Sequence, residues 1–161
     1  MLPKRKSPRL KEYDYSLPGA YFVTICTQGR CNLFGLEPEL TPTGKIVKEQ
    51  IELLKTRYDE ITIDKYVVMP NHIHIIITIS ETERINPFPT IKHDIPNVIG
   101  KFKAGVTRSV GNEFMHSAKK KIWQKSFHDR IIRNEDDYKK IWEYIDTNPL
   151  KWELDCFYNR E

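Results

Sequence analysis

The chain has 161 residues, enough for one domain with its own core, and 39% hydrophobic and 30% charged residues are ordinary for a globular protein. No apolar run approaches the roughly 20 residues of a membrane-spanning helix, and the first 11 residues lack the apolar stretch of a secretory signal. These features predict neither a membrane-spanning helix nor a secretory signal. The cysteines form no Cys-x-x-Cys pair, so we expect three free thiols in a reducing cytoplasm: Cys26, Cys31 and Cys156.

The net charge of +4 conceals an uneven distribution. Residues 1–11 carry five basic side chains and no acidic one, and residues 96–133 carry nine basic side chains against two acidic ones. Residues 134–161 reverse the sign, with four basic and eight acidic side chains. Basic segments favour a phosphate-bearing partner, above all nucleic acid, although a lysine-rich face can also be merely solvated.

The first elements in chain order are a strand and a helix. Residues 20–27 are rich in β-branched and aromatic side chains and predict a strand. Residues 28–40 are typical of a loop that can hold a short hairpin. The spaced apolar side chains that follow predict an amphipathic helix that ends near Tyr58, with Thr43 as a candidate N-cap.

Two further strands flank a turn at residues 70–71, and the second begins with two histidines. Strands with so short a connection should pair antiparallel, so residues 61–69 should pair with the strand that follows. Alternate side chains of a strand share a face, so His72 and His74 lie on one face and four isoleucines form an apolar face opposite: Ile73, Ile75, Ile77 and Ile79. Two strand positions rise by about 6.6 Å, so the two imidazoles can close on one metal ion. Such a pair can instead face solvent or accept hydrogen bonds in a core.

The next segment is basic. Residues 80–94 are polar, contain two prolines and predict a loop, and residues 96–111 predict a second amphipathic helix. A basic loop at residues 115–121 leads to a short strand at residues 126–132.

The last helix is predicted between Asn134, a good N-cap before three acidic residues, and Pro149. Its apolar stripe is spaced i, i+3, i+4, i+7 and comprises Tyr138, Ile141, Trp142 and Ile145. Tyr144 and Asn148 form an i, i+4 pair at the edge of this stripe.

The whole chain predicts a single α+β domain in which helices pack on a small antiparallel sheet. Residues 1–19 form a basic lead-in, and residues 149–161 form a tail that we expect to pack back on the domain.

A tyrosine hydroxyl has an ordinary pKa near 10 and needs help to act as a nucleophile at neutral pH. A divalent metal that grips a phosphodiester supplies such help. Two histidines and an amide oxygen one helical turn from Tyr144 suit Mg²⁺, Mn²⁺ or another first-row ion. Tyr144 is the better candidate than Tyr138, which falls within the apolar stripe.

Three motifs, in the right order, resemble the HUH single-tyrosine transposases and in particular their REP-associated branch. Residues 70–74, PNHIH, resemble the His-hydrophobe-His motif. Residues 122–135, IWQKSFHDRIIRNE, resemble a second block of that branch, and residues 144–149, YIDTNP, match the Tyr-Ile-x-x-Asn-Pro pattern of its catalytic helix. Residues 15–27 are similar to its first strand.

The resemblance implies a ferredoxin-like α+β fold that cuts and rejoins single-stranded DNA near hairpins, in a prokaryotic, nucleoid-associated protein. It implies that His72, His74 and Asn148 hold Mg²⁺ or Mn²⁺ and that Tyr144 forms a 5′-phosphotyrosine. Relatives more often carry Gln at the third ligand position, and the shorter Asn148 fits the REP-associated branch. Insertion-sequence relatives are homodimers, whereas a monomer also fits this branch.

Basic side chains are the predicted DNA contacts, and Trp123 can either stack on a base or pack in the core. These candidate residues are Lys4, Arg5, Lys6, Lys101, Lys103, Arg108, Lys119, Lys120, Lys121 and Trp123. Two alternatives stay open, namely a domesticated hairpin-DNA-binding protein without cleavage activity and an RNA-binding module on the same sheet.

Overall fold

The computed structural model describes residues 10–81, 93–113 and 121–158. Its strands are β1 (Gly19–Cys26), β2 (Gly35–Leu36), β3 (Glu39–Leu40), β4 (Ile61–Met69), β5 (His72–Ile79) and β6 (His128–Ile132). Its α-helices are α1 (Pro42–Arg57), α2 (Ile95–Glu113) and α3 (Glu135–Thr147), and two 3-10 segments are η1 (Gln28–Arg30) and η2 (Pro149–Leu154). The predicted strands and helices are confirmed to within a few residues, as is the short hairpin, formed by β2 and β3.

Four strands form the main sheet in the order β4-β5-β1-β6, and every neighbouring pair is antiparallel. Helix α1 connects β1 to β4, and α2 connects β5 to β6, so each helix crosses over one intervening strand. This β-α-β-β-α-β arrangement is the ferredoxin-like topology. The predicted fold class is therefore confirmed.

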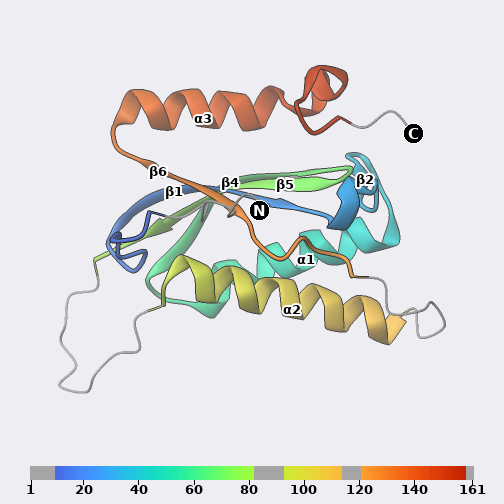
Figure 1. The fold of residues 1–161 in the computed structure, drawn as a ribbon, viewed down its shortest axis with the longest axis horizontal. Helices are drawn as coiled ribbons and strands as arrows, with labels where there is room; N and C mark the ends of the chain where they lie inside the picture. Colours follow the sequence, from blue (N-terminus) through green and yellow to red (C-terminus); the bar gives the residue numbers. More distant parts are fainter. Residues whose placement is uncertain (1–9, 82–92, 114–120, 159–161) are drawn as a thin grey trace, which may run out of the picture.

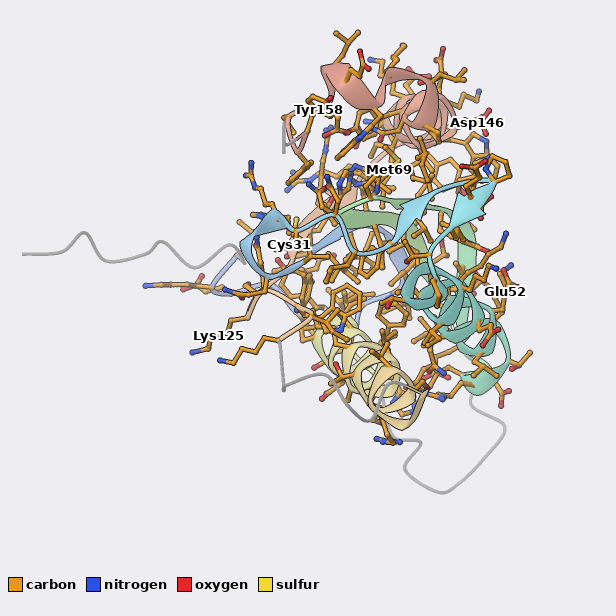
Figure 2. The ribbon with its side chains drawn as sticks, turned by 90° about the vertical axis from the view of Figure 1, so that its right-hand side faces the viewer. Cys31, Glu52, Met69, Lys125, Asp146 and Tyr158 are labelled. Atoms are coloured by element: carbon orange, nitrogen blue, oxygen red, sulfur yellow. The ribbon has the colours of Figure 1, made fainter. Side chains whose placement is uncertain are left out.

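The sheet is covered on both faces (Figure 1). Helices α1 and α2 lie on one face and α3 lies on the other, as the view turned by 90° in Figure 2 also shows. The core on the α1 and α2 side includes Ile73, Ile75 and Ile77 of β5. Ile76, one position out of phase, belongs to the smaller core under α3, on the face that also carries the two histidines. The alternation predicted for β5 is confirmed.

The N-cap of helix α1 lies two positions earlier in the chain than the sequence predicted. The N-cap is Thr41, whose Oγ1 accepts a hydrogen bond from the backbone N–H of Gly44 at 3.0 Å. Pro42 occupies the first helical position, where its missing N–H costs nothing, so the cap must be the residue before it. The assignment of Thr43 as the cap was wrong, since Thr43 lies inside the first turn.

Helix α3 has the predicted cap, with Asn134 Oδ1 accepting from the backbone N–H of Asp137 at 2.8 Å. Ile141 and Ile145 are buried against the sheet. Trp142 departs from the predicted apolar stripe, since it is 37% exposed and its ring lies under the Lys65 ammonium, 4.9 Å from the centroid. The buried stripe is narrower than predicted because α3 lies alone on this face of the sheet. Only the side chains of α3 that point toward the sheet are buried.

Two polar contacts tie α3 to β4. The Tyr138 hydroxyl donates to Oδ2 of Asp64 at 2.8 Å, and Lys65 pairs with Asp146 at 2.6 Å. Asp64 sits at a register shift in β4, and its carboxylate also accepts from the Thr78 hydroxyl of β5. These bonds fix where α3 lies over the sheet.

Parts of four predicted segments fall outside the described residues: residues 1–9 of the basic lead-in, residues 82–92 of the 80–94 loop, residues 115–120 of the basic loop and residues 159–161 of the tail. Within the described part of the chain, no helix is long and apolar enough to cross a membrane.

Candidate active site

The two histidines of β5 meet beneath α3. His72 and His74 are both buried, and their Nε2 atoms lie 3.0 Å apart. Each ring is held at its other nitrogen: His72 Nδ1 lies 2.8 Å from Asn71 Oδ1, and His74 Nδ1 lies 2.8 Å from Thr24 Oγ1. Such outer partners orient histidines that bind metals.

Asn71 decides which nitrogen of His72 carries the proton. Its Nδ2 donates to two backbone carbonyls, those of Arg30 at 3.2 Å and Phe157 at 2.8 Å. Carbonyls only accept, so Oδ1 must be the atom that faces His72. That oxygen also only accepts, hence Nδ1 of His72 donates and Nε2 keeps its lone pair for a ligand.

Burial keeps both imidazoles neutral. Removal from water lowers the pKa of His72 to about 4, although the nearby Asp155 carboxylate acts in the opposite direction. Burial lowers the pKa of His74 well below its ordinary value, and the neighbouring His72 lowers it further. Neutral imidazole is the form that binds metal ions.

Tyr144 projects from α3 onto this pair. Its hydroxyl lies 3.3 Å from His74 Nε2, and its side chain remains accessible, since the residue is 40% exposed. Burial raises the pKa of Tyr144 to about 12, with the Asp155 charge acting in the same direction. The hydroxyl is therefore protonated at neutral pH. Tyr138, the second candidate, instead donates its hydroxyl to Asp64.

Asn148 lies one turn beyond Tyr144, at the junction of α3 and η2. The residue is buried, and its Nδ2 donates to Oδ2 of Asp155 at 2.8 Å. Its Oδ1 is buried and has no hydrogen-bond partner among the described residues. A buried amide oxygen without a partner is costly, which makes this atom available to a ligand.

Asp155 is the residue that the sequence analysis missed. Its Oδ2 lies 3.8 Å from Nε2 of His72, and one ligand atom from each of His72, His74 and Asp155 lies within 4.8 Å of the others. The chain becomes extended at Asp155 after η2, which brings the carboxylate under the end of α3. The only sequence signal was the acidic excess of residues 134–161, which does not single out one residue.

The segment after η2 also closes one side of the site. The Phe157 ring packs against the ring of His72, with centroids 4.6 Å apart, and the Arg30 guanidinium lies 5.4 Å from the Phe157 centroid. The open side is a cavity of about 460 Å³. Its lining includes Tyr144, Asn148, Lys151, Leu154 and Asp155.

The predicted DNA contacts on α2 lie elsewhere. Helix α2 covers the face opposite α3 (Figure 1), so Lys101, Lys103 and Arg108 are not brought together with the histidine pair. Lys103 Nζ donates to the carbonyls of Gln124 and Ser126, while Lys101 lies 5.9 Å from the Tyr58 ring centroid. Both lysines thus make contacts within the chain.

The remaining predicted contacts divide into three groups. Trp123 is buried, with ring centroids 5.4 Å from Phe34 and 5.8 Å from Phe102, so it packs in the core and does not offer its ring to a base. Lys121 is exposed. The other residues fall outside the described part of the chain: Lys4, Arg5, Lys6, Lys119 and Lys120.

Comparison with known proteins decides the family. The family model described as "Transposase IS200 like" matches residues 20–148, which is most of the chain. The chain belongs to the IS200-like transposase family. The match begins at β1 and ends at Asn148, so it contains the histidine pair and Tyr144 of this IS200-like transposase.

Two relatives match most of the chain. An uncharacterized protein of Haemophilus influenzae is 35% identical over 96% of this chain and 93% of its own length. The REP-associated tyrosine transposase of Escherichia coli is 27% identical over 85% of this chain and 70% of its own length.

A solved structure also matches. A REP-associated tyrosine transposase bound to a REP hairpin has a TM-score of 0.64 and 26% identity, covering 91% of this chain and 76% of that one. The resemblance to REP-associated transposases is confirmed.

Proposed function

We propose that this IS200-like transposase cleaves and rejoins single-stranded DNA at hairpin sequences through a covalent 5′-phosphotyrosine. The observation that carries the proposal is the Tyr144 hydroxyl, which lies 3.3 Å from His74 Nε2 on a residue that lines the cavity. The Tyr144 ring packs against Phe22 and His74, and the position of its hydroxyl beside two buried neutral imidazoles suits attack on a metal-bound phosphate.

The residues present fit a divalent metal. The two Nε2 atoms, the Oδ1 of Asn148, which has no partner among the described residues, and the nearby carboxylate of Asp155 form a mixed nitrogen and oxygen donor set, which suits Mn²⁺ or Mg²⁺. We propose that His72, His74 and Asn148 hold the ion. When bound, it would polarise the scissile phosphate and offset the negative charge of the attack.

Tyr144 supplies the nucleophile in this proposal. Its oxygen forms a bond to phosphorus and its phenolic proton passes to solvent. The bond from phosphorus to the 3′-oxygen breaks, and this oxygen takes up a proton from solvent to give a 3′-hydroxyl. Attack by a 3′-hydroxyl on the phosphotyrosine reverses these steps and restores Tyr144. The phosphoester bonds are exchanged one for one, so no external energy source is required.

Hairpin DNA is the proposed partner because the solved relative is bound to a REP hairpin. Lys151 lines the cavity and Arg30 lies at its closed side, so both can contact phosphates near the site. The exposed residues Lys101, Arg108 and Lys121 are proposed to contact DNA further away. The alternative of a hairpin-binding protein without cleavage is disfavoured by the complete set of site residues.

The test is a denaturing gel of the protein with labelled single-stranded hairpin DNA from the neighbourhood of its gene. Mn²⁺ or Mg²⁺ should give a protein-linked band that chelator removes. The band should disappear in Tyr144→Phe and should still form, only more slowly, in Tyr138→Phe on the same helix. Binding without a covalent band would overturn the cleavage proposal and favour the domesticated binding protein.

A further inference from the structure

A carboxylate lies buried beside the histidine pair without a cationic partner in the described part of the chain. The Asp155 side chain is 1% exposed. Its Oδ1 accepts from the backbone N–H of Phe157 at 2.7 Å, and its Oδ2 accepts from Asn148 Nδ2 at 2.8 Å. Among the described residues, the one basic side chain within ion-pair distance of Asp155 is His72, whose Nε2 lies 3.8 Å from Oδ2. A buried anion is costly unless a cation or several donors compensate it.

The neighbouring amide strengthens this observation. Asn148 is only 4% exposed, and its contact with Asp155 directs Nδ2 toward the carboxylate. The opposite atom, Oδ1, is left buried and without a partner among the described residues. One carboxylate oxygen and one unsatisfied amide oxygen thus occur beside the Nε2 atoms of two neutral imidazoles. Four donors with one net negative charge favour a bound dication.

We propose that Asp155 is a further ligand of the divalent metal, so that the segment after η2 completes the metal site. This inference rests on the proposed metal-dependent function. It extends the three ligands His72, His74 and Asn148 to a fourth that lies beyond residue 148, where the family match ends. The carboxylate adds a hard, anionic oxygen, which raises affinity for Mn²⁺ and Mg²⁺ and makes the position of the tail depend on the metal.

The position of Phe157 fits this role. Its backbone N–H holds Asp155 Oδ1, its carbonyl accepts from Asn71, and its ring covers His72. The tail is therefore anchored on Asn71, which also orients His72. A carboxylate held at two points keeps the geometry that a metal ligand needs.

Metal titration tests the proposal without relying on activity. Mn²⁺ binding is measured by calorimetry, and coordination is followed by the visible absorption of the Co²⁺-loaded protein. Asp155→Asn should weaken Mn²⁺ binding by about tenfold or more and change the Co²⁺ spectrum. The control Glu153→Gln removes a charge from an exposed residue of the same tail and should change neither.

Asp155→Glu is the second variant, because it keeps the charge and the ligand type. It should bind Mn²⁺ more tightly than Asp155→Asn. Thermal unfolding in chelator shows whether each variant is folded, and only folded variants are compared. Equal Mn²⁺ affinity for the wild type and Asp155→Asn, with an unchanged Co²⁺ spectrum, would overturn the proposal.

Two outcomes separate this inference from the proposed function. If His72→Ala abolishes Mn²⁺ binding and Asp155→Asn does not alter it, the metal site stands and only the role of Asp155 fails. If His72→Ala binds Mn²⁺ as tightly as the wild type, the metal site itself is misplaced. Tighter metal binding or faster cleavage by Asp155→Asn would identify the tail as a plug of the site and would also overturn the ligand role.

Discussion

The hydroxyl of Tyr144 lies 3.3 Å from Nε2 of His74, although 70 residues separate them in the chain. The histidine is set by the pairing of β5 with β1 and β4, and the tyrosine is set by the docking of α3 on the sheet.

Tyr144→Phe should abolish the covalent adduct while leaving hairpin affinity and fold nearly unchanged. The tyrosine is 40% exposed, so loss of its hydroxyl should alter the free energy of unfolding by only about 0.5 kcal/mol or less. Urea unfolding and gel-shift titration measure the two quantities. An adduct that survives this change would move the nucleophile to another tyrosine, with Tyr138 the next candidate.

His72→Ala and His74→Ala should each lose metal-dependent cleavage, because each removes a neutral nitrogen ligand from the site. Initial rates of adduct formation across a Mn²⁺ titration provide the measurement. His128→Ala, at an exposed residue of β6, is the control and should cleave normally. Undiminished turnover of either site variant with Mg²⁺ would contradict the metal assignment.

The metal-free protein should lose stability as the pH falls from about 6.5 toward 4. Burial lowers the pKa of His72 to about 4 in the folded state, whereas an unfolded histidine titrates near 6.5. Between these pH values the unfolded chain binds more protons than the folded protein, so the free energy of unfolding decreases as the pH is lowered.

Urea midpoints in chelator at pH 7 and pH 5 check this expectation. The decrease between them should be smaller in His72→Gln, which has no ionisable group at the position. Equal midpoints at the two pH values in the wild type would contradict the argument.

Tyr138→Phe should slow adduct formation without changing metal affinity. The hydroxyl donates to Asp64 and helps to fix α3, so its removal should cost about 0.5–1.5 kcal/mol of stability. Tyr66→Phe removes a similar tyrosine–carboxylate bond, to Glu52 of α1, on the other side of the sheet. That control should leave the rate of adduct formation unchanged. If Tyr66→Phe slowed adduct formation as much as Tyr138→Phe does, the slowing could not be attributed to the anchoring of α3.

Hairpin affinity should fall as salt rises, because phosphate contacts release counterions from DNA. Binding measured at several salt concentrations gives the slope. Lys151→Gln, in the cavity lining, should reduce both the affinity and the slope, whereas Lys139→Gln, at an exposed residue of α3 outside that lining, should not. A flat salt response would argue against basic residues as the DNA contacts.

Local patterns in the sequence were sufficient to predict the helices, the strands and part of the candidate site. The alternation in β5 placed Ile73, Ile75 and Ile77 on the core face and both histidines on the other, because successive side chains of a strand point to opposite faces. The cap at Asn134 and the spacing of Ile141 and Ile145 likewise depend on neighbours within a helix.

Contacts between segments distant in the chain could be identified only from the tertiary structure. The approach of Tyr144 to His74, the burial of Trp123 and the separation of α2 from the site all follow from which face of the sheet each helix covers. Asp155 lies beside His72 because the tail is anchored by Phe157 and Asn71, a set of bonds between segments more than 80 residues apart. Local propensity carries no information about such contacts, because they are fixed by packing between elements and not by spacing along the chain.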